Sequence, residues 1–229
     1  MSSSIGPAPL PRQPFKWLLL IVLFAGGVWY LSYDLVYVVT RDRTNEPPWR
    51  NVLLLVHVVG AVPLLLLPPA QFSRRVRRRW PIWHRRAGTW YLASAIVAAL
   101  AAMVLGPTFE GAGRRVPLML FATLWLCFSL AAWWCARRGA FAAHERFVAR
   151  SYAIALAFVF VRVLGDVQEP LFAFLPDQEV RGVTREWLSF VLSLLTVEAG
   201  YSWWPAIRAA RRTSGSAPAS RVMSTHPNA

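Results

Sequence analysis

The sequence contains few cysteines and few acidic side chains for its length. Its 229 residues include two cysteines and 11 Asp and Glu against 25 Lys and Arg, and charged residues make up only 16%. Soluble domains average about 25% charged residues, and 56% of this chain is hydrophobic, so a soluble globular protein is disfavoured. A formal net charge of +14 usually indicates that the partner is nucleic acid or an anionic membrane surface.

The two cysteines, Cys127 and Cys135, lie eight positions apart in one apolar run. In a helix that spacing separates them by about 12 Å along the axis, whereas a disulfide requires Cα atoms within about 7 Å. We therefore expect no intrachain disulfide. The sequence has no zinc-type spacing of Cys and His, so it predicts no metal site. It also lacks the motifs of P-loop, dinucleotide-binding, zinc-protease and serine-hydrolase proteins.

Long apolar runs dominate the chain, and six of them approach the roughly 20 residues that a helix needs to cross a bilayer. They are residues 17–39, 51–71, 88–106, 116–136, 146–165 and 187–207. A soluble helical bundle would need a polar face on each helix, and residues 17–29 and 116–131 have none. The pattern predicts an all-α polytopic membrane helix bundle with six transmembrane helices over residues 16–209. We expect the tails, 1–15 and 210–229, to be disordered.

Loop charges predict the orientation of the bundle. One side of the predicted bundle holds 17 Lys and Arg and one acidic residue. It consists of residues 72–87 and 137–145, both tails and the adjoining helix ends. The opposite connections, residues 40–50, 107–115 and 166–186, hold 7 Arg and eight acidic residues. Because basic residues stay on the cytoplasmic side, both termini are predicted to be cytoplasmic (N-in, C-in). The basic residues lie in short loops rather than in a domain, so nucleic acid is disfavoured as a partner.

Four ionisable residues lie in the interior of the predicted spans, away from their cytoplasmic ends: Asp34, His57, Arg162 and Glu198. Such residues cost about 2.5–3.5 kcal/mol on insertion scales and are functional by default. Gly60 follows His57 on the same helix face, so another helix is expected to approach closely there. We hypothesise a polar pocket, open to the outer side, that binds or transports a small molecule or ion. The alternative is structural: Arg162 pairs with Asp166 or Asp34, and the others close gaps between helices.

A second group of candidate residues lies at the predicted cytoplasmic face. It comprises Gln71, His84, Arg85, His144, Arg146 and Arg150. Arginines near a membrane surface attract anionic lipid head groups, at about 1 kcal/mol each, and their forked guanidinium groups also bind phosphorylated metabolites. The alternative is that the basic run Arg74–Arg79 only orients the helices. Membrane lipids are therefore predicted partners, and a lipid-interacting accessory protein is one functional hypothesis.

The histidines raise a further alternative, because membrane b-type cytochromes hold each haem between two axial histidines on facing helices. Only His57 lies inside a predicted span. His84 and His144 occur in matched contexts at the opposite face, and they can pair only with each other, provided that their helix ends are adjacent. A membrane redox enzyme, or another enzyme with a cofactor such as haem near His84 and His144, is therefore an alternative hypothesis.

Five pieces of the sequence resemble a known family in combination. They are His57-Val-Val-Gly60; Pro69-Ala-Gln71-Phe72 before the Arg run; His84-Arg85-Arg86-Ala-Gly88-Thr-Trp-Tyr91; Ala143-His144-Glu-Arg146 leading to Arg150-Ser151-Tyr152-Ala153; and Arg162. The chain resembles the bacterial membrane-protein family called domain of unknown function 2306, although Val148-Ala149-Arg150 stands where that family usually has Met-Ile-Arg. The resemblance implies a multi-helix integral membrane protein and implies no activity. We expect the protein to be a multi-pass protein of the bacterial inner membrane.

Overall fold

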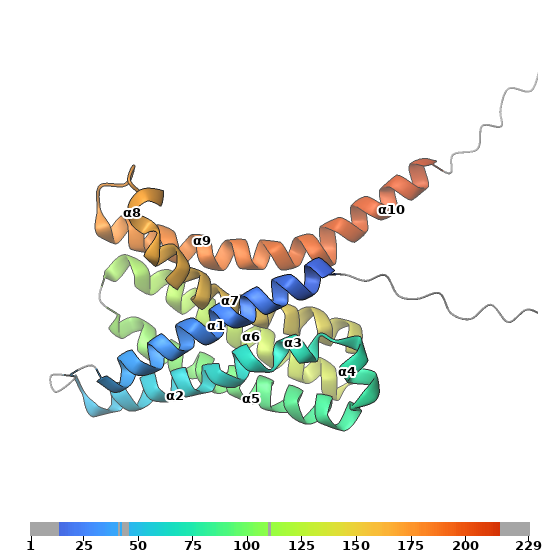
Figure 1. Cartoon of the computed structure of the whole chain (residues 1–229), viewed down its shortest axis with the longest axis horizontal. Helices are drawn as coiled ribbons and strands as arrows, with labels where there is room; N and C mark the ends of the chain where they lie inside the picture. The colour runs from blue at the N-terminus through green and yellow to red at the C-terminus, as the bar shows by residue number, and fades with distance from the viewer. Residues whose placement is uncertain (1–13, 41, 43–45, 110, 216–229) are drawn as a thin grey trace, which may run out of the picture.

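Residues 14–40, 42, 46–109 and 111–215 are described by the structure, a computed structural model, except for the side chains of residues 14–20, 22, 23, 34 and 212–215. This part of the chain is helical apart from short connections and contains no strand. Its long helices form a bundle (Figure 1). They are α1 (Pro14–Thr40), α2 (Pro48–Leu66), α5 (Pro81–Leu105), α6 (Ala112–Arg137), α7 (Phe141–Asp166) and α9 (Gln178–Glu198).

Short helical pieces join or extend the long helices. They are α3 (Pro68–Gln71), α4 (Arg74–Arg79), the 3-10 turn η1 (Gly106–Thr108), α8 (Gln168–Leu171), the π-helical turn η2 (Ala199–Trp203) and α10 (Trp204–Gly215). The expected loop 72–87 is therefore mostly helical. The Ser73 hydroxyl accepts a bond of 3.4 Å from the backbone N–H of Val76 and so caps α4. The backbone at Trp80 is non-helical and separates α4 from α5.

The two expected tails are only partly covered by the described residues. Residues 1–13 and 216–229 lie outside them, and α1 begins at Pro14. α10 reaches Gly215, so residues 210–215 are helical where the sequence suggests a disordered tail. The reason is that α10 follows directly from the π-helical turn and α9, so its first turn is already formed.

Four helical stretches of the described part are long and apolar enough to cross a membrane. They are Pro48–Gln71, Pro81–Thr108, Ala112–Arg137 and Phe141–Asp166. A helix of 26 residues, such as α6 or α7, is about 39 Å long and exceeds the roughly 30 Å hydrocarbon core. α9 is not among the four, because its first half carries Arg181, Arg185 and Glu186. The fold is an all-α bundle with four candidate membrane-spanning helices.

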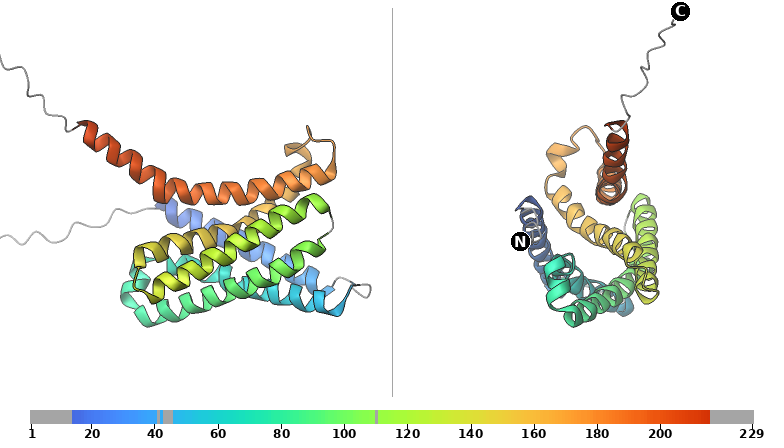
Figure 2. Two further views of the ribbon diagram at one scale, coloured as in Figure 1. Left: turned by 180° about the vertical axis from the view of Figure 1, so that it is seen from behind. Right: turned by 90° about the vertical axis from the view of Figure 1, so that its right-hand side faces the viewer.

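α7 occupies the centre of the bundle. It packs against α1, α2, α6 and α9, while α5 lies between α2 and α6 (Figure 2). Small buried residues such as Ser151, Ala153 and Ala157 line α7, and small side chains let neighbouring helices approach closely. The expected close approach at Gly60 is confirmed: a Cβ atom there would lie 3.3 Å from Cβ of Ala98 on α5.

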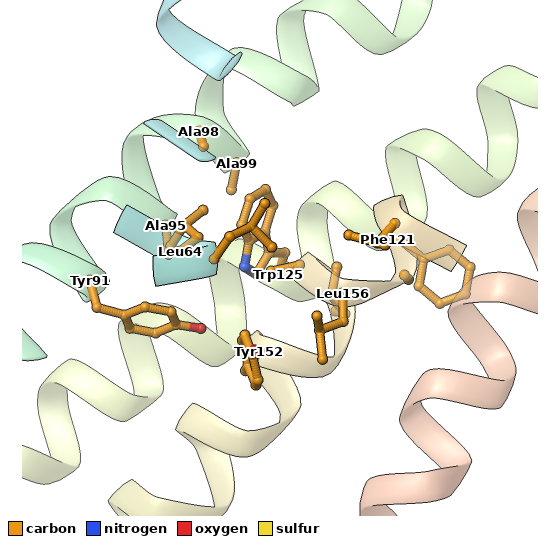
Figure 3. Close-up of a cluster of buried hydrophobic side chains, with 14 of the residues drawn as sticks. Leu64, Tyr91, Ala95, Ala98, Ala99, Phe121, Trp125, Tyr152 and Leu156 are labelled. Atoms are coloured by element: carbon orange, nitrogen blue, oxygen red, sulfur yellow. The ribbon is translucent and has the colours of Figure 1, made fainter. Parts of the chain in front are cut away.

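Aromatic side chains hold α6, α7 and α9 together in the core. Trp125 on α6 is almost fully buried among the α5 alanines, next to Leu64 of α2 (Figure 3). Phe121 on α6 stacks on Phe190 of α9, with ring centroids 4.3 Å apart, and Phe158 of α7 meets Phe190 edge to face at 5.3 Å. Because aromatic pairs have preferred geometries as well as large buried area, they fix how α9 sits on α6 and α7.

Candidate functional site

The connecting segments gather at two opposite ends of the bundle. At one end, which we call the mixed-charge end, the N–H of Gly113 donates to Oε1 of Glu179 over 3.1 Å and joins two of the connections rich in acidic residues. At the other, the basic end, Nη1 of Arg77 lies 3.9 Å from Oε2 of Glu145 and joins the two basic connections. The start of α1 and the end of α10 both lie at the basic end (Figures 1 and 2).

His57, the candidate on α2, is held by a backbone group and two aromatic rings. Its Nδ1 is 2.9 Å from the carbonyl oxygen of Ala98 on α5. The imidazole meets Trp125 and Phe158 edge to face, at centroid distances of 6.4 and 5.8 Å. These contacts orient the ring between α2, α5, α6 and α7. Ala98, which packs closely against Gly60, is also the residue whose carbonyl oxygen contacts His57.

Glu198 pairs with Arg150, which the sequence analysis places in the second candidate group, at the predicted cytoplasmic face. Its Oε1 accepts a hydrogen bond of 2.6 Å from Nε of Arg150 on α7, and its Oε2 accepts one of 2.8 Å from the Ser202 hydroxyl. Arg146, one turn before Arg150, adds a further positive charge nearby. Glu198 therefore belongs to the basic end, together with Arg146 and Arg150.

The remaining intramembrane candidates lie toward the mixed-charge end. The side chain of Asp34 lies outside the described residues, and its backbone is part of α1. Arg162 is exposed on α7 and close enough to Arg185 of α9 for their charges to repel. Tyr30 of α1 donates a hydrogen bond of 2.5 Å to Oδ2 of Asp166 at the end of α7. This contact connects the first helix to the central one.

The structure adds a group of residues that sequence reasoning missed, where Arg114 and Arg185 converge on Glu186. Nη2 of Arg114 donates to Oε1 of Glu186 over 3.1 Å, and Nη2 of Arg185 lies 3.9 Å from the same oxygen. The three side chains are 23%, 15% and 4% exposed in that order. We call these three residues the arginine–glutamate cluster. Their signal in the sequence is that each charge lies one or two residues before a long apolar run.

Two glycines make room for the two arginines of the cluster. A Cβ atom on Gly182 would lie 3.3 Å from Cδ and 3.4 Å from Nε of Arg114, so that side chain lies flat against α9. A Cβ atom on Gly165 would lie 3.0 Å from Nη1 of Arg185, so that guanidinium rests on the last turn of α7. The carboxyl end of a helix favours nearby positive charge, which stabilises Arg185 in this place.

The cluster carries more positive than negative charge. Burial lowers the pKa of Arg185, the carboxylate of Glu186 opposes this effect, and the charges of Arg114 and Arg162 add to the lowering. Arginine nevertheless stays protonated at any physiological pH. Nη1 of Arg185 also donates to Oε1 of Gln168 over 3.1 Å. The Nε atoms of Arg114 and Arg185 are buried and have no hydrogen-bond acceptor among the described residues.

At the basic end, the positive charges of His144 and Arg77 act on His84. Nδ1 of His144 is 2.9 Å from the carbonyl oxygen of Ala132 on α6. Nδ1 of His84 and Nε2 of Gln71 are buried without a hydrogen-bond partner in the described part. Within that part, no group of three or more His, Cys, Asp or Glu side chains is arranged to hold a metal ion.

The other candidates of the basic end are more exposed. Arg85 and Arg146 face outward, and Arg150 is half-buried in its pair with Glu198. Two turns further into the bundle, the hydroxyl groups of Tyr91 and Ser151 lie 3.3 Å apart, and those of Ser129 and Ser151 lie 2.9 Å apart. These buried bonds tie α5, α6 and α7 together next to the histidines.

These features define an integral membrane helix bundle with a charged cluster at one end and a group of basic residues at the other. Residues 54–199 match the model of a family described as "Predicted membrane protein (DUF2306)", and the chain belongs to this family. The match confirms the resemblance that the sequence motifs suggest. No curated protein and no solved structure matches the chain.

Proposed function

We propose that this protein crosses the bacterial inner membrane six times, with both termini in the cytoplasm, and binds a small oxyanion at the mixed-charge end. The oxyanion is a carboxylate or phosphate group of a small solute. The arginine–glutamate cluster replaces the pocket of Asp34, His57, Arg162 and Glu198 as the centre of this hypothesis, because Glu198 pairs with Arg150 at the opposite end.

The six-span arrangement adds α1 and α9, with its π-helical continuation, to the four candidate spans. Residues 187–203 contain Glu198 as their sole ionisable Asp, Glu, Lys or Arg side chain, and α9 packs along α6 and α7. An even number of spans puts both termini on one side, in keeping with the start of α1 and the end of α10 at the basic end. The excess of Lys and Arg at that end favours the cytoplasm for it.

The single observation that carries the binding proposal is that Arg114 and Arg185 share one carboxylate oxygen, Oε1 of Glu186. A purely structural ion pair needs one guanidinium for one carboxylate, and burying an extra charge is costly. The two Nε–H groups without acceptors are the donors that a forked contact with a second oxyanion uses. A bound oxyanion would neutralise the surplus charge and satisfy both donors.

Thermal unfolding of the purified full-length protein in detergent tests this proposal. The buffers contain acetate, succinate or phosphate, each compared with chloride at equal ionic strength. A ligand that binds only the folded state raises Tm with its concentration, so we expect at least one oxyanion to raise Tm above the chloride value. Arg185→Gln should abolish that rise.

The matched control is Arg115→Gln, which removes the same charge from the next position of α6. Arg115 is exposed and donates only to the carbonyl oxygen of Phe109, over 2.9 Å, so this variant should keep the response. Glu186→Gln should increase the response, because it leaves both guanidinium groups without their shared carboxylate. A Tm that is equal in all four salts would overturn the proposal. So would a rise in Tm that is lost equally in Arg185→Gln and in the control Arg115→Gln.

A further inference from the structure

The basic end carries an exposed aromatic surface that the oxyanion site does not use. It lies at the elbow between α4 and α5, where the non-helical backbone of Trp80 interrupts the chain. Trp80, Ile82 and Trp83 are 55%, 59% and 43% exposed. Tryptophan is enriched where a membrane protein meets the lipid head groups, since its ring is apolar and its N–H is polar. The elbow is therefore a surface suited to the lipid interface.

Two shallow hollows flank the two tryptophans of the elbow. The first has a volume of about 340 Å³. Its lining is apolar and consists of Ala70, Val76, Trp80 and Trp83. The second has a volume of about 380 Å³ and is lined by Arg79, Trp80, Pro81, Ile82, Trp83 and Arg86. Because Trp80 and Trp83 belong to both, an apolar hollow adjoins one whose lining includes two arginines.

The charge of the elbow is almost unopposed. Residues 72–87 contain seven arginines and no acidic residue. Among the described ion pairs, Arg77 is the one arginine of this segment that meets a carboxylate, 3.9 Å from Glu145. Arg79 instead lies over the ring of Trp80, with Cζ 5.8 Å from the centroid. Arg79 and Arg86 are thus available to an anion from the membrane.

We propose that this elbow binds one anionic phospholipid of the cytoplasmic leaflet. Its phosphate group lies between Arg79 and Arg86, where guanidinium forks match phosphate oxygens. Its glycerol and upper acyl chain lie across Trp80 and Trp83 in the apolar hollow beside Val76. A water-soluble phosphate would contact the arginines but leave the apolar hollow uncovered, and this favours a lipid as the occupant. The inference uses the proposed orientation of the bundle and is independent of the oxyanion site.

Native mass spectrometry of the detergent-purified full-length protein measures this binding. Phosphatidylglycerol and the zwitterionic phosphatidylcholine are titrated separately, and the dissociation constant of the first bound lipid is compared. Each arginine near an anionic surface contributes about a fivefold factor, so the double substitution R79Q/R86Q should weaken phosphatidylglycerol binding about 30-fold. Binding of phosphatidylcholine should change far less.

Two further variants separate this site from general surface charge and from loss of folding. The double substitution R137Q/R138Q removes the same charge at the same end, where Arg138 also lies over an exposed ring, Trp134. It should leave the first phosphatidylglycerol constant unchanged. Trp83→Ala keeps every charge and should weaken phosphatidylglycerol binding severalfold.

Three results would overturn the proposal. They are an equal loss in R79Q/R86Q and R137Q/R138Q, full binding in Trp83→Ala, and binding of soluble glycerol phosphate as tight as that of phosphatidylglycerol. Arg185→Gln should bind phosphatidylglycerol like the unmodified protein, so the oxyanion proposal and this one fail separately.

Discussion

Arg150 on α7 donates a hydrogen bond of 2.6 Å from Nε to Oε1 of Glu198 on α9. The pair is half-buried, and Glu198 is the last residue of α9 before the π-helical turn. The contact therefore anchors the point at which α9 leaves the bundle and passes into α10. Hydrogen bonds to charged groups contribute more than neutral ones, at about 1.5–3 kcal/mol, and partial exposure reduces that value.

Breaking this pair should destabilise the protein. We expect Arg150→Gln and Glu198→Gln each to lower the free energy of unfolding by about 1–2 kcal/mol, and the double variant to cost less than the two effects added, since the residues share one contact. Unfolding of the purified protein by denaturant measures this. Arg146→Gln removes an exposed charge one turn away and should have little effect. Additive losses in the double variant would show that the two residues act separately.

The glycines beneath the arginine–glutamate cluster should be sensitive to a single methyl group. Gly182→Ala places a Cβ atom 3.3 Å from the Arg114 side chain, and overpacking of this kind costs about 1–3 kcal/mol. We expect the thermal response to oxyanions to decrease together with stability. Gly26→Ala is the control, because a Cβ atom there meets nothing within 4 Å and alanine favours helix. A variant Gly182→Ala that behaves like Gly26→Ala would show that Arg114 is not held in place by α9.

The orientation can be tested by labelling single cysteines in intact cells. In a chain with Cys127→Ser and Cys135→Ser, we expect Phe174→Cys at the mixed-charge end to react with a membrane-impermeant maleimide from outside. Ala140→Cys at the basic end should react only after the membrane is permeabilised, because the proposed topology, which follows the positive-inside rule, places its loop in the cytoplasm. Both positions are exposed in the structure, so accessibility does not limit either reaction. The reverse labelling pattern would contradict the proposed topology.

The haem hypothesis has a direct spectroscopic test. We expect the purified protein to show no Soret band, although the charge of His144 acts on His84. Two turns inward on the same helices, Tyr91 and Ser151 are in hydrogen-bond contact at 3.3 Å. A porphyrin held between two axial histidines would need α5 and α7 to be farther apart there. A Soret band that disappears in His84→Ala and persists in His57→Ala would instead support a haem at the basic end.

Much of the fold could be predicted from the sequence, because a chain in a bilayer must bury its backbone polar groups in helices. The apolar runs at 51–71, 88–106, 116–136 and 146–165 each lie within one of the four candidate spans. The helix ends were less predictable, since a helix does not stop where the hydrocarbon does. α9 begins at Gln178 because Asp177 accepts hydrogen bonds from the N–H groups of Glu179 and Val180, and this cap lies before the apolar run.

Residue partners could be predicted far less well. Arg114 and Glu186 are 72 positions apart, and their pairing depends on how α6 and α9 are rotated and how deeply they pack. Side-chain type and helix depth suggest a common level for Asp34, His57 and Arg162, with Glu198 deeper, but the direction in which each side chain points is set by packing. Glu198 faces Arg150 across α7 and α9, and His57 faces the rings of Trp125 and Phe158.

The sequence by itself determined that this is a helical membrane protein whose positive charge lies mainly on one side, because hydropathy and charge are properties of segments and need no partner. Only the tertiary structure decided which charges meet. Two arginines share Glu186, each lying against a glycine of a neighbouring helix, and such contacts exist only after α6, α7 and α9 have packed side by side.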